Sequence, residues 1–358
     1  DNAGNISEEK TSQVRIDKVK PSAPVITNTS DGKWTNKNVT ITLKSTDANS
    51  GIAKYQLKYS GTNGAWKDVS NPDTWSEERN ETVYYRAVDN AGNVSAESST
   101  VIKIDKTAPT KPTYVSRYQD KTAYTSGTWT NKTAYTDITT EDKASGVAKI
   151  QYSFDNSTWG DLSLLASSGI QVSGKKATGT EEWTLEDRNN NVWFRAVDNV
   201  GNVSEASDVF NVKYDLTAPT ASKTEVKNLT ATGYDVYVYN VADAGSGVHR
   251  VQFPTWTDSN GQDDIISDWV TNSKSTGIKQ SDGTTWVYHV NTTDHKNEYG
   301  KYNTHIYAYD NLGNSKMIGN VEPTVPGVTV TYNYSENGGT SATKTSATVG
   351  YNLAVDLT

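Results

Sequence analysis

A five-residue motif, Asp-Asn-x-Gly-Asn, occurs four times in this chain of 358 residues. The copies lie at Asp1–Asn5, Asp89–Asn93, Asp198–Asn202 and Asp310–Asn314. Successive copies begin 88, 109 and 112 residues apart, which is the size of a small domain and too long for one unit of a solenoid. The motif therefore predicts a string of similar small domains. Because the first copy stands at the very start, the chain is expected to be a segment cut from a longer protein.

The composition favours strands and turns. Tyr (21) and Trp (10) outnumber Phe (4) and Met (1), and Thr, Ser, Asn, Asp and Gly are abundant. β-branched and aromatic residues favour strands, whereas the small polar residues favour turns. No segment longer than a few residues has the apolar period of a helix. Short strands separated by Gly, Asn and Asp turns predict an all-β fold of antiparallel β-sandwich domains.

Two domain-sized segments share the same landmarks. Asp47–Gln56 resembles Asp142–Gln151, and Val83–Asp89 resembles Val192–Asp198. The second pair has the two-residue period of a half-buried strand. The side chains predicted to face the core are Val83, Tyr85 and Ala87 in one segment and Val192, Phe194 and Ala196 in the other. The motif that follows each strand is expected to close a hairpin, with Gly supplying a positive φ.

The landmarks and the Ala-Pro pairs between them set the expected domain boundaries. Residues 1–17 are predicted to be the end of a preceding domain, with a turn and a strand at Ser12–Ile16. Residues 18–106, 107–216 and 217–326 are the first, second and third repeats, and 327–358 is the first half of a different domain. That last part reads as two strands joined by a Gly-Gly turn. The proline after each repeat is expected to stiffen a short linker and to favour an elongated array.

The first two repeats resemble the bacterial immunoglobulin-like repeats of Gram-positive surface proteins. The resemblance rests on Arg-Ala-Val-Asp-Asn-x-Gly-Asn-Val-Ser followed by Asp-x-Thr-Ala-Pro-Thr, and it covers roughly residues 1–220. It implies tandem immunoglobulin-like β-sandwich domains but supplies no function.

The third repeat is similar to the GBS Bsp-like repeat. The matching segments are Val251–Trp256, Asn260–Ile265, His295 and Tyr302–Tyr307. That family accompanies cell-wall hydrolases and surface proteins, and the resemblance supplies no ligand. The end of the chain from Val328 resembles the opening of a Listeria–Bacteroides repeat, the β-grasp module of internalin-type proteins.

Three aspartates are candidates for calcium binding: Asp47, Asp142 and Asp243. Each precedes a Ser-Gly pair, and Asp105 or Asp215 in the linkers offers further oxygens. Calcium needs about six to eight converging oxygens, more than any one of these loops carries. Turn chemistry alone is therefore the favoured explanation, with Ca²⁺ as the alternative and no other cofactor expected.

A ligand-binding site is predicted in the third repeat, where two loops have no counterpart in the other repeats. Carboxylates, an amide, an indole and histidines there suit a polar ligand such as a glycan, a peptidoglycan fragment or a host surface ligand. The candidate residues are Trp256, Asn260, Gln262, Asp263, Asp264, His295 and His305. The alternative is structural: Asp263 and Asp264 cap loop amides, and Trp256 packs beneath them.

The four histidines all lie in the third repeat, but their spacing does not match a zinc motif. By register, His305 is expected on the strand face opposite the core. The recurrent tryptophans of the first two repeats are more simply explained by packing than by sugar binding.

Several function classes are disfavoured. A net charge of −8 argues against nucleic acid, and no apolar run is long enough to cross a bilayer. The absence of cysteine excludes disulfides and a thiol nucleophile, and it suits a bacterial surface protein. Asp263 and Asp264 would point to opposite faces of a strand, so they do not form a glycosidase pair.

The sequence therefore predicts a non-catalytic, monomeric segment of a large bacterial cell-surface or secreted protein, located outside the cell. Its domains would act as a semi-rigid stalk that presents other domains. Two alternatives remain: an adhesin or carbohydrate-binding module with the third repeat as binder, and the accessory domains of a peptidoglycan hydrolase.

Overall fold

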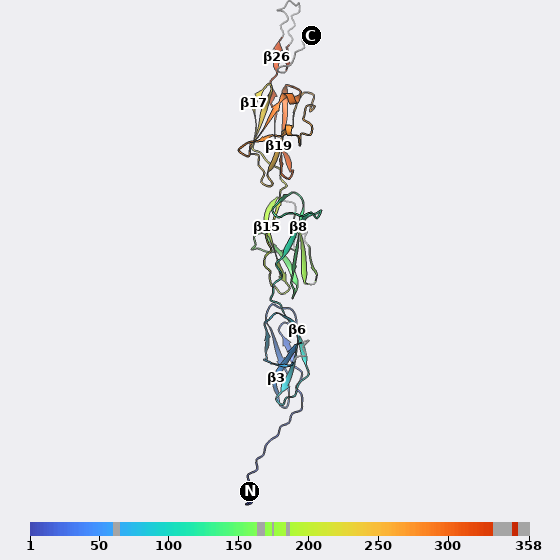
Figure 1. The fold of residues 1–358 in the computed structure, drawn as a ribbon, viewed down its shortest axis with the longest axis vertical. Coiled ribbons are helices and arrows are strands. Elements are labelled where there is room, and N and C mark those ends of the chain that lie inside the picture. Colours follow the sequence, from blue (N-terminus) through green and yellow to red (C-terminus); the bar gives the residue numbers. More distant parts are fainter. Residues whose placement is uncertain (60–64, 163–168, 174, 184–186, 332–345, 350–358) are drawn as a thin grey trace, which may run out of the picture. The chain divides into compact units, whose positions relative to one another are not determined.

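The regular secondary structure of the chain consists almost entirely of β-strands in the computed structural model (Figure 1). The structure describes residues 1–358 except 60–64, 163–168, 174, 184–186, 332–345 and 350–358. Contacts divide the chain into two compact units. The first contains Asp1–Arg117, Tyr135–Glu182 and Val192–Val209, and the second contains Tyr118–Ala134, Trp183–Asn191 and Phe210–Thr358. The all-β prediction is confirmed.

Two antiparallel sheets enclose the core of the first repeat. One has the order β1 (Val25–Asn28), β2 (Val39–Lys44) and β5 (Asp73–Trp75). The other has the order β4 (Lys67–Val69), β3 (Ile52–Tyr59), β6 (Arg79–Asp89) and β7 (Ser98–Ile104). The alternation predicted for β6 is observed: Val83, Tyr85 and Ala87 are fully buried. Since successive side chains of a strand point to opposite faces, Tyr84 and Arg86 remain partly exposed.

The second repeat contributes strands to both compact units. In the first unit, one sheet has the order β13 (Gly169–Ser173), β14 (Lys176–Trp183), β10 (Ala134–Glu141) and β8 (Thr113–Tyr118). Another begins with β12 (Gly160–Asp161), β11 (Val147–Ser153) and β15 (Arg188–Asp198). In the second unit, β16 (Phe210–Tyr214) pairs in parallel with β9 (Trp129–Thr130). Val192, Phe194 and Ala196 on β15 are fully buried, as predicted.

The third repeat is a sandwich of two larger sheets. One has the order β17 (Lys223–Thr230), β18 (Gly233–Tyr239), β22 (Trp286–Asn291) and β21 (Ile278–Lys279). The other is built on β23 (Gly300–Asp310), which pairs with β19 (Val248–Gln252), β20 (Thr255–Thr257), β24 (Ser315–Val321) and β25 (Thr324–Val325). Two 3-10 helices, η2 (Ser273–Ser275) and η3 (Thr292–His295), lie in the loops. Tyr234, Phe253 and Tyr302 are fully buried in its core.

The two ends of the chain differ in how far the predictions hold. The turn at Asp1–Asn5 is present, but the strand predicted at Ser12–Ile16 is wrong, because the chain there has no neighbouring strand with which to pair. At the other end, β26 (Val328–Thr331) and β27 (Ser346–Val349) pair as predicted. The Gly-Gly turn lies outside the described residues. None of the helical segments in the described ranges has the length and apolar character needed to span a bilayer.

Candidate functional site

The aspartate of each Asp-Asn-x-Gly-Asn motif organises its own turn. In the second copy, Asp89 Oδ1 accepts hydrogen bonds from the backbone N–H groups of Ala91 (2.9 Å) and Asn93 (2.8 Å). Its Oδ2 accepts a third from the Asn93 side-chain amide at 2.8 Å. Gly92 has φ +91°, a region that L residues rarely adopt. The same set of contacts recurs at Asp198 and at Asp310.

The first asparagine of the motif holds a second loop. Asn90 Nδ2 donates to the carbonyl oxygens of Ser50 (2.8 Å) and Gly51 (3.2 Å). Asn199 makes the same two contacts with the Ser-Gly pair of the second repeat, and Asn311 with that of the third. The turn and the Asp-x-x-Ser-Gly loop are therefore fastened to each other in every repeat.

The last asparagine of the motif holds the linker that enters the repeat. Asn93 Nδ2 donates to the carbonyl oxygen of Asp17 at 3.2 Å. Asn202 makes the equivalent bond to the carbonyl of Asp105 at 3.1 Å. Asn314 does so to the carbonyl of Asp215 at 2.9 Å. We call this arrangement, the motif with the Ser-Gly loop and the linker aspartate, the linker clasp.

The linker aspartate is also held through its carboxylate. Asp105 Oδ2 accepts the backbone N–H of Ser145 at 2.9 Å, and the side chain is fully buried. The backbone N–H of Asp105 in turn donates to the carbonyl of Thr35, in the preceding repeat, at 2.9 Å. Asp215 repeats the pattern, with Ser246 on one side and Thr130 on the other.

Each clasp brings three carboxylates together, with oxygens within 4.8 Å of one another. The groups are Asp17, Asp47 and Asp89; Asp105, Asp142 and Asp198; and Asp215, Asp243 and Asp310. The calcium candidates Asp47, Asp142 and Asp243 thus each meet a linker aspartate and a turn aspartate. Burial raises the pKa of Asp142 and of Asp243, and the neighbouring carboxylates raise it further. The donors are of the type that hard cations prefer, although three carboxylates alone fall short of about six to eight oxygens.

In the third repeat, the candidate residues Asp264 and His295 form a buried pair. Asp264 Oδ2 lies 3.2 Å from His295 Nδ1, and the His295 residue is only 1% exposed. Both Asp264 oxygens also accept the backbone N–H of Thr257. The Glu298 carboxylate accepts the Thr257 hydroxyl. These contacts tie β20, the following loop and η3 together.

The remaining candidate residues are not brought to one point. Asp263 is exposed and forms an ion pair with Lys296, and one of its carboxylate oxygens lies within 4.8 Å of those of Asp264 and Glu298. Asn260 and Gln262 are exposed on the loop. Trp256 and His305 meet elsewhere, on the outer face of the sheet, where their rings lie 4.8 Å apart between centroids and nearly perpendicular. His305 is thus on the face opposite the core, as the register predicted.

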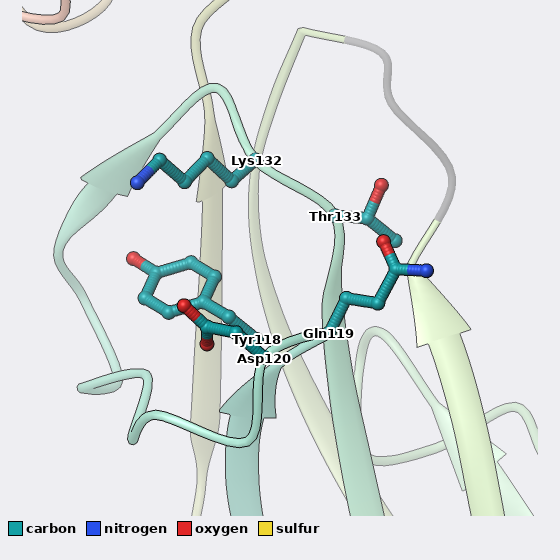
Figure 2. A pocket seen from close by; sticks show the side chains of 5 residues that line it. All are labelled: Tyr118, Gln119, Asp120, Lys132 and Thr133. Carbon is teal, nitrogen blue, oxygen red and sulfur yellow. The ribbon is translucent and has the colours of Figure 1, made fainter.

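In the described residues, the other histidines lie apart from one another, and a surface pocket of the second repeat is lined mainly by polar side chains. His289 Nδ1 lies 2.6 Å from Asp235, and His249 Nδ1 lies 3.3 Å from Asn311, so the described histidines do not converge. Figure 2 shows the pocket lined by Tyr118, Gln119, Asp120, Lys132 and Thr133, with the Lys132 ammonium 6.0 Å from the Tyr118 ring centre. Hydrogen bonds from Thr122 lower the pKa of Asp120, away from the range that a general acid needs.

Comparison with known proteins gives a partial match. Residues 223–322 match the family model of the GBS Bsp-like repeat, which confirms that resemblance for the third repeat. No curated protein matches the chain.

Among solved structures, the chain is similar to the FN1–FN3 domains of chicken CNTN1. The identity is 13%, 86% of this chain and 98% of that one are covered, and the TM-score is 0.26. It is also similar to the fibronectin(III)-like modules of Clostridium thermocellum CbhA, at 17% identity, 53% and 95% coverage and a TM-score of 0.26. A surface glycan-binding protein, SGBP-B of Bacteroides ovatus, solved with a mixed-linkage heptasaccharide, matches at 12% identity with 88% and 72% coverage and a TM-score of 0.19. The strands described above form tandem antiparallel β-sandwich domains, and residues 223–322 match the GBS Bsp-like repeat.

Proposed function

We propose that this segment is a non-catalytic spacer in a bacterial cell-surface or secreted protein. In this role the repeats hold other domains at a distance, and the linker clasps limit bending between successive repeats. The observation that supports the proposal most strongly is the double attachment of Asp105. Its N–H bonds to Thr35 of the first repeat, and its carbonyl and carboxylate bond to Asn202 and Ser145 of the second.

The clasp suits a spacer for a physical reason. A linker of a few residues without such contacts would sample many backbone conformations, each at little cost. Hydrogen bonds from both sides to one buried residue remove that freedom, since breaking them leaves buried polar groups without partners. The same contacts recur at Asp215, so the restriction would apply at successive junctions.

Site-directed spin labels can test this proposal. The chain has no cysteine of its own, so two introduced cysteines would be the only sites labelled. Labels at Lys67→Cys and Lys176→Cys would report the distance distribution between the first two repeats. We expect a narrow distribution in the parent chain and a broad one in Asn202→Ala, which removes the bond to Asp105. Asn93→Ala is the matched control, because Asn93 makes the equivalent bond to Asp17, outside the junction between the two labels. A broad distribution in the parent chain would refute the spacer role.

Two other functions deserve separate tests. An adhesin or carbohydrate-binding role for the third repeat is favoured by the exposed rings of Trp256 and His305. An accessory role beside a peptidoglycan hydrolase domain is suggested because the GBS Bsp-like repeat accompanies cell-wall hydrolases. The flanking sequence of the full-length protein would separate these: a wall-anchoring motif favours the spacer, and a hydrolase domain favours the accessory role.

A further inference from the structure

Four aromatic side chains form a row on the outer face of the third repeat. Trp256 on β20 contacts His305 on β23, with 4.8 Å between ring centroids. His305 lies 6.5 Å from Tyr307, two residues further along the strand. Tyr307 in turn lies 5.0 Å from Trp269, which comes from the loop after β20. All four residues are partly exposed, so the row is open to solvent along its length.

The corresponding face of the first two repeats is capped by arginine. In the first repeat, the Arg86 guanidinium lies 4.2 Å from the centre of the Trp66 ring, and in the second Arg195 lies 4.3 Å from that of Trp159. A cation over an indole face is a stable arrangement that occupies the face. These tryptophans are thus accounted for by packing.

In the strand register, Tyr307 of the third repeat stands at the position that Arg86 and Arg195 occupy in the first two repeats. Gln56 pairs with Arg86 and Gln151 with Arg195, whereas Gln252 pairs with Tyr307. Each arginine also donates to its glutamine, at 2.9 Å in the first repeat and 2.8 Å in the second. Within the part of the chain that the structure describes, no Lys or Arg lies over the four rings of the row.

The border of the row carries amides and a thioether, with one charged side chain near each end: Asp258 beside Asn303, and Arg250 beside Tyr309. Asn320 on β24 pairs with His305, and Met317, which is 48% exposed, pairs with Tyr307. Asn303 lies beside Trp256 in the register and donates to Asp258 at 2.6 Å, which satisfies that carboxylate. Asp258 accepts from Asn303, and the Arg250 guanidinium lies over the Tyr309 ring and donates to the Val270 carbonyl, so both charges are already engaged. The row itself offers rings, amides and one thioether for stacking and hydrogen bonds.

We propose that this row binds a neutral oligosaccharide, with sugar rings stacked on the indole and phenol faces and hydroxyls hydrogen-bonded to Asn320 and His305. Aromatic side chains combine a large apolar face with polar edges, which matches the apolar face and equatorial hydroxyls of a pyranose. The spaced rings present several such platforms in line, as an extended chain of sugars requires. Asp264 and His295 are buried and contact each other, so they are not part of the proposed binding surface.

Calorimetric titration of the full 358-residue chain with neutral and charged oligosaccharides tests the proposal. The probes are soluble β-glucan, galactan and chitin oligosaccharides against hyaluronan and heparin fragments. We expect saturable binding of at least one neutral probe and none of the charged ones. Tyr307→Arg restores the residue that the first two repeats carry at this position, so it should fold normally and weaken binding about tenfold or more. Trp256→Ala should do the same, whereas Trp66→Ala, which removes an indole from the first repeat, should leave binding unchanged.

Three outcomes would overturn the proposal: no neutral probe binds at millimolar concentration, binding survives Tyr307→Arg in a chain of unchanged melting temperature, or only charged probes bind. The last result would assign the surface to an ionic ligand and would also exclude the neutral glycan. None of these outcomes bears on the spacer role, which depends on the linker clasps.

Discussion

The side-chain amide of Asn202 donates a hydrogen bond of 3.1 Å to the carbonyl oxygen of Asp105, 97 positions earlier in the chain. The two residues belong to different repeats by sequence, yet their bond is repeated between Asn314 and Asp215. The motif therefore stabilises its own turn and also binds the linker that precedes the repeat.

Removal of the Asp198 carboxylate should destabilise the second repeat. Asp198→Ala leaves the N–H groups of Val200 and Asn202 without their acceptor, and the residue is only 2% exposed. We expect a loss of about 2–3 kcal/mol in the free energy of unfolding, measured by urea denaturation. Asp208→Ala is the control, because that side chain is 87% exposed and its ion pair with Lys111 is screened by solvent, so its removal should change stability little. Equal effects of the two variants would contradict the prediction.

Acid should weaken the contact between Arg117 and Asp137. Two hydrogen bonds, of 2.6 and 3.1 Å, join these side chains, and the guanidinium lowers the pKa of Asp137 below its ordinary value of 3.8. Because the folded-state pKa is the lower one, the stabilisation is present above the unfolded pKa and is lost as the pH falls through the folded value. The melting temperature of the parent chain should therefore drop more steeply below about pH 4 than that of Asp137→Asn. Parallel pH profiles would show that the pair contributes nothing.

Asp142 should respond to pH in the opposite direction. Its pKa is raised by burial and by Asp105 and Asp198, so its contribution to stability is complete below the unfolded pKa and is lost as the pH rises through the folded value. In buffer treated with a chelator, Asp142→Asn should melt at a higher temperature than the parent chain at pH 7 and at a similar temperature near pH 3. If the parent chain is the more stable of the two at neutral pH once calcium is added, a cation offsets the repulsion.

The buried pair of the third repeat should be structural. His295→Ala leaves the Asp264 carboxylate without its ring partner in a site closed to solvent, which should cost about 3 kcal/mol of stability. His289→Ala is the matched control, because His289 faces Asp235 with a side chain that is 64% exposed. Thermal unfolding of both variants decides the point. A His295→Ala chain that melts like the parent would return His295 to the set of candidate ligand-binding residues.

Local pattern predicted much of the fold but little of the site. The two-residue period was enough to bury Val83, Tyr85 and Ala87, because alternation is a property of the strand itself. The turn chemistry of Asp89 and Gly92 followed from the motif for the same reason. The strand predicted at Ser12–Ile16 failed because a strand needs a partner, which sequence propensity does not supply.

The contacts of the third repeat were harder to predict because they join distant segments. Trp269 reaches Tyr307 only through the path of the loop after β20, which no periodicity encodes. Tyr307 itself could have been found, since it stands two residues from His305 on the same strand face. His295 and Asp264 were predicted to bind a ligand, or in the case of Asp264 to cap loop amides, whereas their burial depends on how η3 packs against β20.

The double attachment of Asp105 also bears on how such a chain should be divided for experiment. A cut placed after residue 106, where the repeats part by sequence, would leave Asp105 at a frayed end and remove the acceptors for Asn202 and Ser145. The smallest autonomous piece would then be a repeat together with the linker that enters it. Asp105 and Asp215 each form hydrogen bonds with the repeats on both sides. Fragments that overlap at these residues should therefore fold better than fragments that meet there.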